Sequence, residues 1–206
     1  IVPGLIEAET LWSCTTCRAC VEECPMIIEH VDAIVGLRRH RNLAHGDAPG
    51  KAAETLANLR ETGTQGGFDI RQRYNWAIDL GVKIAEPSVP VDVLLVAGEG
   101  AFDMRYQRTL RALIKILNKA AVDFALMGPS EQDTGDIPRR LGDEATFQTL
   151  ARRNIATLKS LTFRRIVTPD PHVLHSLRNE YTDLGGNFEV LHHTALIAAL
   201  AREGRL

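Results

Sequence analysis

All four cysteines of this 206-residue chain lie in one short run near its beginning. The run is Cys-Thr-Thr-Cys-Arg-Ala-Cys-Val-Glu-Glu-Cys-Pro, and it places thiols at Cys14, Cys17, Cys20 and Cys24, with Pro25 directly after the last. Thiolates at this spacing can wrap three sulfurs around one corner of an iron–sulfur cubane while the fourth points away. We therefore predict that all four cysteines are ligands of 4Fe-4S clusters.

Two other kinds of cysteine site fit the run less well. A four-cysteine zinc site usually consists of two C-x2-C pairs separated by a longer segment, so that the ligands reach the metal from two directions. A disulfide framework would suit a short secreted chain, but no apolar signal segment lies near Ile1 and no other cysteine is present to pair with the run. The spacing favours iron–sulfur chemistry.

The fourth cysteine raises the question of where further ligands come from. In two-cluster ferredoxins the cysteine before proline belongs to the other cluster, so Cys14, Cys17 and Cys20 need a thiolate from a second run. Three explanations stay open: Cys24 closes the same cluster, a partner supplies thiolates, or the chain is part of a longer polypeptide. The absence of a methionine before Ile1 favours the third. We expect one or two 4Fe-4S clusters, shared with sequence outside this chain.

The charge and hydropathy of the chain limit its partners and location. The formal net charge is −2 at pH 7, so no basic surface is expected to bind nucleic acid. The stretch Arg38-Arg39-His40-Arg41 is interpreted as a solvated helix face. No window approaches the roughly 20 apolar residues that span a bilayer, so membrane contact is expected only through other sequence or a partner. Reduced cysteines and the lack of an export signal predict a cytoplasmic location. Any membrane contact through other sequence or a partner is therefore expected at the inner face of the cytoplasmic membrane.

The first two segments of the chain differ in pattern. Residues 1–45 are predicted to form a helical, ferredoxin-like iron–sulfur module that is incomplete on its own, with a helix over 27–37. Residues 46–90 are polar and interrupted by glycine and proline. This pattern predicts a connector on the surface, with helices at 51–60 and near Trp76.

The last segment, residues 91–206, alternates strands with helices. Its apolar patterns predict strands at 91–97, 122–127, 165–168 and 188–191, and helices around 110–117, 144–161, 173–181 and 194–202. Such alternation gives a mostly parallel sheet covered by helices. The predicted fold class is therefore α/β, with a helical ferredoxin-like half module followed by an α/β domain.

Polar residues follow the predicted strands at one rim of the sheet. They are Glu99, Asp133, Asp170 and the pair His192-His193. Ligands of parallel sheets bind beyond the carboxyl ends of the strands, so these groups are expected to converge. The Gly98-Glu-Gly100 turn is similar to a dinucleotide-binding loop, but Asp103 stands where a third glycine is needed, so no nicotinamide site is predicted.

Motifs beyond the cysteine run indicate a family. They are Gly-Ala-Phe-Asp103, Thr-Gly-Asp136, Arg139-Arg-Leu-Gly-Asp143-Glu-Ala-Thr-Phe147, Pro171-His172, Asn179-Glu-Tyr181 with Gly185-Gly186, and Val-Leu-His-His193. Together these segments resemble the iron–sulfur subunits related to heterodisulfide reductase, which join a ferredoxin-like module to a domain with cysteine-rich CCG motifs. More narrowly, Leu11-Trp-Ser-Cys-Thr-Thr-Cys-Arg-Ala-Cys20 and residues 92–111 resemble the membrane-linked electron-transfer proteins of bacterial dimethylglycine demethylation.

The resemblance also has departures. Relatives with a cluster in the second domain have cysteines close to Glu99, Asp133, Asp170 and Val173 of this chain, and none of these four is a cysteine. Carboxylates bind iron–sulfur clusters poorly compared with thiolates. The resemblance thus implies a degenerate CCG domain without disulfide chemistry, in an oxidoreductase component to which no catalytic residue is assigned.

Two hypotheses about function follow. In the first, the chain relays electrons from a flavin-dependent demethylase or dehydrogenase, or from an electron-transfer flavoprotein, toward membrane quinone. In the second, it is a non-redox docking subunit with a structural cluster.

The rim acids Glu99, Asp133 and Asp170 also allow two outcomes. The favoured one is that they separate and pair with arginines such as Arg139 or Arg140; the other is that they converge with His172 on a small cavity for a hard cation or a partner loop. His172 and His193 are expected to be hydrogen-bonded structural residues.

Overall fold

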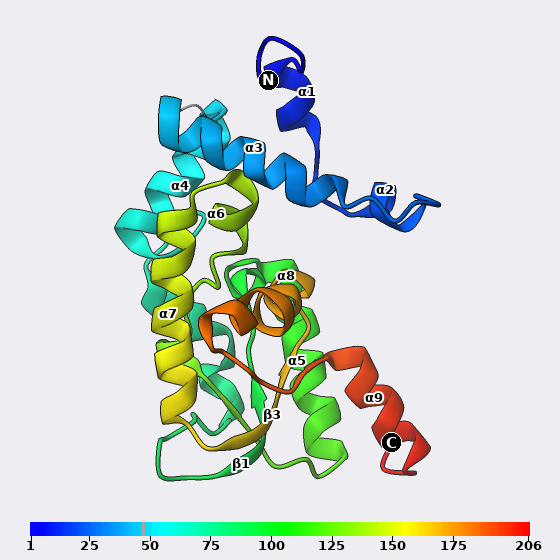
Figure 1. Ribbon diagram of the computed structural model, residues 1–206. Coiled ribbons are helices and arrows are strands. Elements are labelled where there is room, and N and C mark those ends of the chain that lie inside the picture. The colour runs from blue at the N-terminus through cyan, green and yellow to red at the C-terminus, as the bar shows by residue number, and fades with distance from the viewer. Residues whose placement is uncertain (47) are drawn as a thin grey trace.

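The chain folds into a parallel sheet between two layers of helices, with a further helical segment at one end (Figure 1). The structure is a computed structural model that describes residues 1–46 and 48–206. Its α-helices are α1 (Ala8–Ser13), α2 (Ala19–Glu22), α3 (His30–His45), α4 (Gly50–Thr62), α5 (Met104–Lys119), α6 (Asp136–Leu141), α7 (Glu144–Ser160), α8 (Pro171–His175) and α9 (His193–Arg202). The other helical segments are the 3-10 helices η1 (Ile70–Leu80), η2 (Glu99–Phe102), η3 (Gly128–Ser130) and η5 (Tyr181–Leu184), and the π-helix η4 (Ser176–Glu180).

Four strands form one sheet with the order β2-β1-β3-β4. They are β1 (Val91–Leu95), β2 (Phe124–Leu126), β3 (Phe163–Thr168) and β4 (Val190–His192). All neighbouring pairs are parallel, so the prediction of an α/β fold with a parallel sheet is confirmed. Each strand begins and ends within two residues of its predicted position.

Alternate residues of β1 enter two separate cores, as the two-residue period of a strand requires. Val93 and Leu95 pack with the apolar faces of α5, α9 and η1. Leu94 packs on the opposite face with α7 and with the segment from α8 to η5. The sheet is therefore covered on both faces, which explains why its strands are almost continuously apolar.

Part of the predicted connector belongs to the core. Trp76 and Ala77 are buried against α5 and β1, and Arg73 is 2% exposed. The prediction that residues 46–90 lie on the surface is wrong at these positions. The physical reason is that η1 covers an edge of the apolar face that α5 leaves open, which the polar composition of the segment does not reveal.

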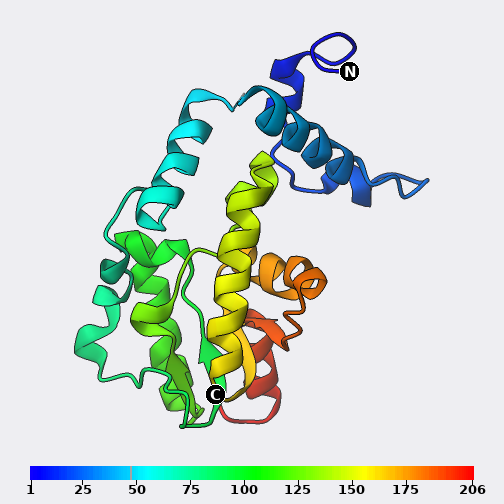
Figure 2. The same cartoon turned by 60° about the vertical axis from the view of Figure 1, so that its left-hand side comes forward.

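The cysteine-bearing segment lies at one end of the molecule. Helix α3 packs against α6, and α1 and α2 contact α3. Figures 1 and 2 show the segment around α2 projecting away from the sheet in both views. The thiol run is thus presented at the periphery of the fold and lies outside its central core.

Contact between α3 and α6 depends on one glycine. Gly142 ends α6 with φ +81°, and a Cβ there would lie 2.3 Å from the Arg39 nitrogen and 2.4 Å from the Arg38 carbonyl carbon. We expect Gly142→Ala to lower the free energy of unfolding by at least about 2 kcal/mol, from left-handed strain and backbone overlap. Urea denaturation checks this. Gly36→Ala is the control, because a Cβ at Gly36 meets nothing within 4 Å. Equal stability of both variants would contradict the expectation.

Candidate functional site

The four cysteines lie on the segment that links α1 to α3. Cys14 follows α1, Cys17 lies in the loop, Cys20 is in α2 and Cys24 comes after α2. All four thiols are free. Cys17 and Cys20 are exposed, whereas Cys14 and Cys24 are half-buried. The thiols can therefore be reached by a metal cluster or a partner without opening the core.

Backbone conformation around the cysteines directs N–H groups at the sulfurs. The Thr16 N–H donates to Cys14 Sγ at 3.3 Å. Hydrogen bonds from the Ala19 N–H, and then from the Thr15 hydroxyl, lower the pKa of the Cys17 thiol. The backbone N–H groups of Ile28 and Met26 lower the pKa of the Cys24 thiol. Donors of this kind favour the thiolate, which is the form that binds metal.

The side chains as placed do not form a closed metal site. Among residues 1–46 and 48–206, no group of three or more His, Cys, Asp or Glu side chains is arranged to hold a metal ion. The donor chemistry nevertheless fits an iron–sulfur cluster, because four free thiols with N–H donors at several sulfurs stand on an accessible segment.

Arg38 links the cysteine segment to the rest of the fold. Its side chain is 3% exposed, so the prediction of a solvated helix face is wrong at this position. The guanidinium lies 5.0 Å from the centroid of the Trp12 ring. Its Nη2 donates to the carbonyls of Leu11 at 2.8 Å and Cys14 at 2.6 Å, and its Nη1 to the carbonyl of Arg140 at 3.1 Å.

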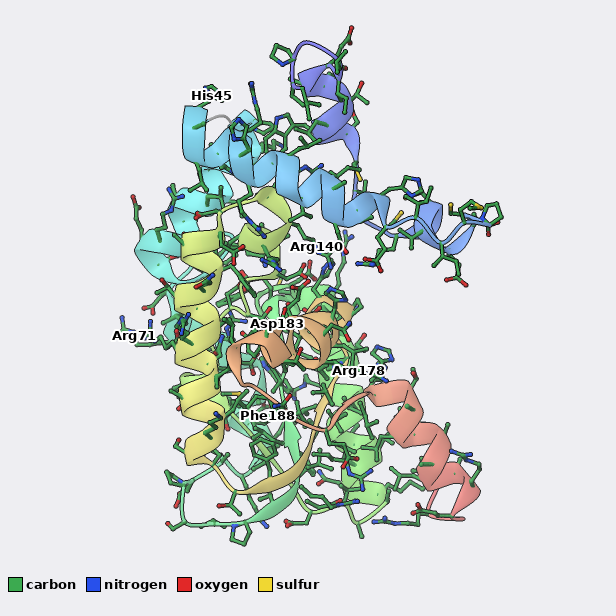
Figure 3. The ribbon with its side chains drawn as sticks, viewed as in Figure 1. His45, Arg71, Arg140, Arg178, Asp183 and Phe188 are labelled. Atoms are coloured by element: carbon green, nitrogen blue, oxygen red, sulfur yellow. The ribbon has the colours of Figure 1, made fainter. Side chains whose placement is uncertain are left out.

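Arg140 contacts the same segment from α6. Figure 3 shows Arg140 beneath α3, on the side of the sheet domain. Its Nη1 donates to Thr16 Oγ1 at 2.9 Å, and its Nε to Asp136 Oδ2 at 2.7 Å. Asp136 also lies 2.8 Å from His172 Nδ1. Burial opposes ionisation of Asp136, but the hydrogen bonds from His172 and Arg140 outweigh burial and lower its pKa.

A second cluster of charges fills the carboxyl end of the sheet. The strand order changes direction at β1, and ligands of α/β folds bind at such a switch point. Here the position is occupied by Arg73, whose Nη2 donates to Glu99 Oε2 at 2.8 Å and whose Nη1 lies 3.8 Å from Glu131 Oε1. Glu131 also accepts the N–H groups of Ala97 at 3.0 Å and Gly98 at 2.7 Å. Burial raises the pKa of Glu131, against the opposing effect of Arg73.

Gln65 joins two of the predicted rim acids. Its N–H donates to Glu99 Oε1 at 2.8 Å and its Nε2 to Asp133 Oδ2 at 2.9 Å. Burial raises the pKa of both carboxyls, and the charge of Asp133 adds to the effect on Glu99. Asp170 instead accepts the N–H groups of His172 and Val173 and so caps α8.

The arginines that pair with the rim acids differ from those expected. Arg139 bridges Glu144 and Glu180, and Arg140 pairs with Asp136, so the predicted pairing with Arg139 or Arg140 is wrong for Glu99, Asp133 and Asp170. Glu99 is bound by Arg73 and Gln65 instead, and Asp133 is bound by Gln65. Arg73 and Gln65 both come from the segment that was expected to be a surface connector. Two aromatic residues that follow Arg73, namely Tyr74 and Trp76, are a local signal of burial in that segment.

Asp103, Gly98 and His192 have local structural roles, whereas His193 Nδ1, which was expected to be hydrogen-bonded, is buried without a hydrogen-bond partner in the described part of the chain. Asp103 caps α5 by accepting the N–H groups of Arg105 and Tyr106. The backbone at Gly98 lies so close to the Asp170 side chain that a Cβ there would be 2.3 Å from Asp170 Oδ2. His192 Nδ1 lies 2.7 Å from the Thr194 hydroxyl. The Gly98-Glu-Gly100 turn therefore accommodates side chains of the protein itself.

Curated proteins resemble the chain over almost its whole length. It is 58% identical over 208 residues to a protein of Chromohalobacter salexigens named "probable membrane-anchored ferredoxin", a match that covers 98% of this chain and 31% of that protein. It is 39% identical over 208 residues to an "EtfAB:quinone oxidoreductase" of Syntrophomonas wolfei, covering 98% of this chain and 29% of that protein. It is 36% identical over 214 residues to the "probable iron-sulfur-binding oxidoreductase FadF" of Bacillus subtilis, covering 100% of this chain and 30% of that protein.

These relatives are about three times as long as the chain, which spans close to a third of each. Their names support the prediction of an iron–sulfur electron-transfer family. They do not mention a CCG domain or dimethylglycine. No protein-family model matches the chain, and no solved structure matches it significantly. In the described part of the chain, no helix has the length and apolar character needed to cross a membrane.

Proposed function

We propose that this chain is the iron–sulfur segment of an electron-transfer oxidoreductase. Cys14, Cys17 and Cys20 bind one 4Fe-4S cluster, and Cys24 binds a second, with the remaining thiolates supplied by sequence outside the chain. The observation that carries the proposal is the run of four free, accessible thiols at the cluster spacing, on a segment similar to named iron–sulfur and ferredoxin proteins. Such a cluster supplies one-electron transfer.

The protein's own residues prepare the site for that role. N–H donors at Cys14, Cys17 and Cys24 favour the thiolate forms. The projecting position of the segment lets a partner approach within electron-transfer distance. The α/β domain holds the segment through Arg38 and Arg140. These residues bind, orient and expose the ligands, and they take part in no bond making.

The partners proposed are a flavoprotein and membrane quinone. One relative is named as an EtfAB:quinone oxidoreductase and another as membrane-anchored. We propose that the electron donor is an electron-transfer flavoprotein or a flavin-dependent demethylase such as one acting on dimethylglycine. Quinone is reached through sequence outside this chain, at the inner face of the cytoplasmic membrane.

The α/β domain is proposed to be a degenerate CCG domain without a redox centre. Where thiolates would stand in cluster-bearing relatives, Glu99 and Asp133 are bound by Gln65, and Arg73 fills the space beside them. Because protein side chains occupy the space of a second cluster, the domain is expected to lack disulfide chemistry, which leaves the electron relay through the cysteine run. A docking subunit with a structural cluster is the second candidate, supported by the same filled rim.

Metal analysis of the full-length protein tests the proposal. We expect anaerobically purified protein to contain about four iron and four acid-labile sulfide per cluster. A redox titration followed by electron paramagnetic resonance is expected to show a reducible cluster. Zinc in place of iron would contradict the iron–sulfur assignment, and a cluster that does not titrate would favour the docking subunit.

A further inference from the structure

The loop from Cys14 to Cys17 is tied to the α/β domain by two arginines from different helices. Arg38 in α3 donates from one guanidinium to the Cys14 carbonyl and to the Arg140 carbonyl, so a single buried side chain joins the loop to α6. Arg140 in α6 returns the contact by donating to the Thr16 hydroxyl at 2.9 Å and the Thr16 carbonyl at 3.3 Å. The two side chains thus hold the loop at Cys14 and at Thr16.

The backbone of the loop needs such support. Thr16 has φ +55° and is 5% exposed. A β-branched residue at positive φ is strained and persists only where its surroundings fix it. The contacts from Arg140 to Thr16 provide that fixation, and they lie directly between two proposed cluster ligands, Cys14 and Cys17.

A cleft of about 310 Å³ lies between the cysteine segment and α6, lined mostly by charged residues that include Arg18, Asp32, Arg39 and Glu180. Because solvent can enter this cleft, the hydrogen bonds from the buried Arg38 and the partly buried Arg140 act as direct restraints on the loop. Hydrogen bonds from charged donors are stronger than neutral ones.

The two guanidiniums also place positive charge beside the loop that carries Cys14 and Cys17, because Arg38 donates to the Cys14 carbonyl and Arg140 to the Thr16 carbonyl. A reduced cluster carries one more negative charge than an oxidised one, so a nearby guanidinium stabilises the reduced form.

We propose that Arg38 and Arg140 are positioning residues that fix the cysteine loop on the α/β domain and raise the reduction potential of the cluster bound there. The inference rests on the proposed function. It assigns to the α/β domain the role of controlling cluster geometry and charge, in addition to any docking role.

Redox titration and hydrogen exchange on the full-length, cluster-loaded protein test the inference. For Arg140→Gln we expect the equilibrium constant of one-electron reduction to fall about tenfold, which is ~59 mV. Amides of residues 14–17 are expected to exchange at least about tenfold faster. Arg140→Lys keeps the charge, so the potential should stay near the wild-type value while exchange still increases. Arg38→Lys should likewise increase exchange, because an ammonium cannot span the carbonyls of Cys14 and Arg140.

Arg164→Gln is the matched control, because Arg164 is an exposed arginine at the start of β3 that pairs with Asp92. It should change neither readout. Equal potential shifts in Arg140→Gln and Arg164→Gln, or wild-type exchange of the loop in both Arg38→Lys and Arg140→Gln, would overturn the inference. A wild-type protein without iron would instead overturn the proposed function, and exchange of the loop in the same variants would then decide alone whether the arginines hold it.

Discussion

In the proposed relay, replacement of Cys17 with serine is expected to stop electron flow to quinone while substrate still reduces the flavin of the proposed partner. Mutation of a residue that only hydrogen-bonds to a metal ligand already lowers activity about 10- to 100-fold. Loss of a ligand itself is therefore expected to lower the rate of quinone reduction by more than roughly 100-fold. Cys17 is exposed, so the hydroxyl leaves the fold unchanged. The measurement is stopped-flow absorbance of flavin and quinone in the reconstituted system.

Ser13→Ala serves as the control for the serine variant. Ser13 is exposed next to Cys14, and its hydroxyl donates to the Glu9 carbonyl. We expect wild-type rates for both steps in this control. If a correctly folded Cys17→Ser protein also failed to support flavin reduction, the relay assignment would be wrong, because the flavin step precedes the cluster.

Regular elements of this fold follow closely from the sequence. The β-branched run at 91–97 and the amphipathic pattern of α5 are local signals, since burial of each residue is determined by the period of its own element. The parallel order of strands then follows from their alternation with helices. For the same reason, the cysteine spacing can be interpreted without knowing the rest of the fold.

Buried arginines could not be predicted in this way. The burial of Arg38 depends on the carbonyl of Arg140, which is 102 residues away in the sequence, and that of Arg73 on Glu99 and Glu131. A guanidinium is retained inside a protein only where distant segments supply acceptors. The local sequence around Arg38 or Arg73 does not indicate where those acceptors lie.

The second large effect is expected at Arg73. Arg73→Met leaves the carboxyls of Glu99 and Glu131 buried without their guanidinium, which should lower the free energy of unfolding by about 3–5 kcal/mol. Arg71→Met, two residues earlier in η1, is the matched control, because its side chain is 84% exposed and pairs with Asp69 at the surface. We expect little change in that variant. Urea denaturation of both proteins makes the comparison.

The loss at Arg73 should depend on pH in a defined direction. Burial raises the pKa of Glu131 above its ordinary value of 4.5, so the native state binds more protons than the unfolded state and stability falls as pH rises through the raised pKa. Arg73 opposes that rise, and without it the pKa of Glu131 moves higher. The difference in unfolding free energy between Arg73→Met and wild type should therefore be small in acid and grow toward neutral pH. Adding Glu131→Gln to the variant should remove much of this pH dependence. A difference that is constant over the same pH range would show that Arg73 acts through packing, and that its charge does not balance the buried carboxyls.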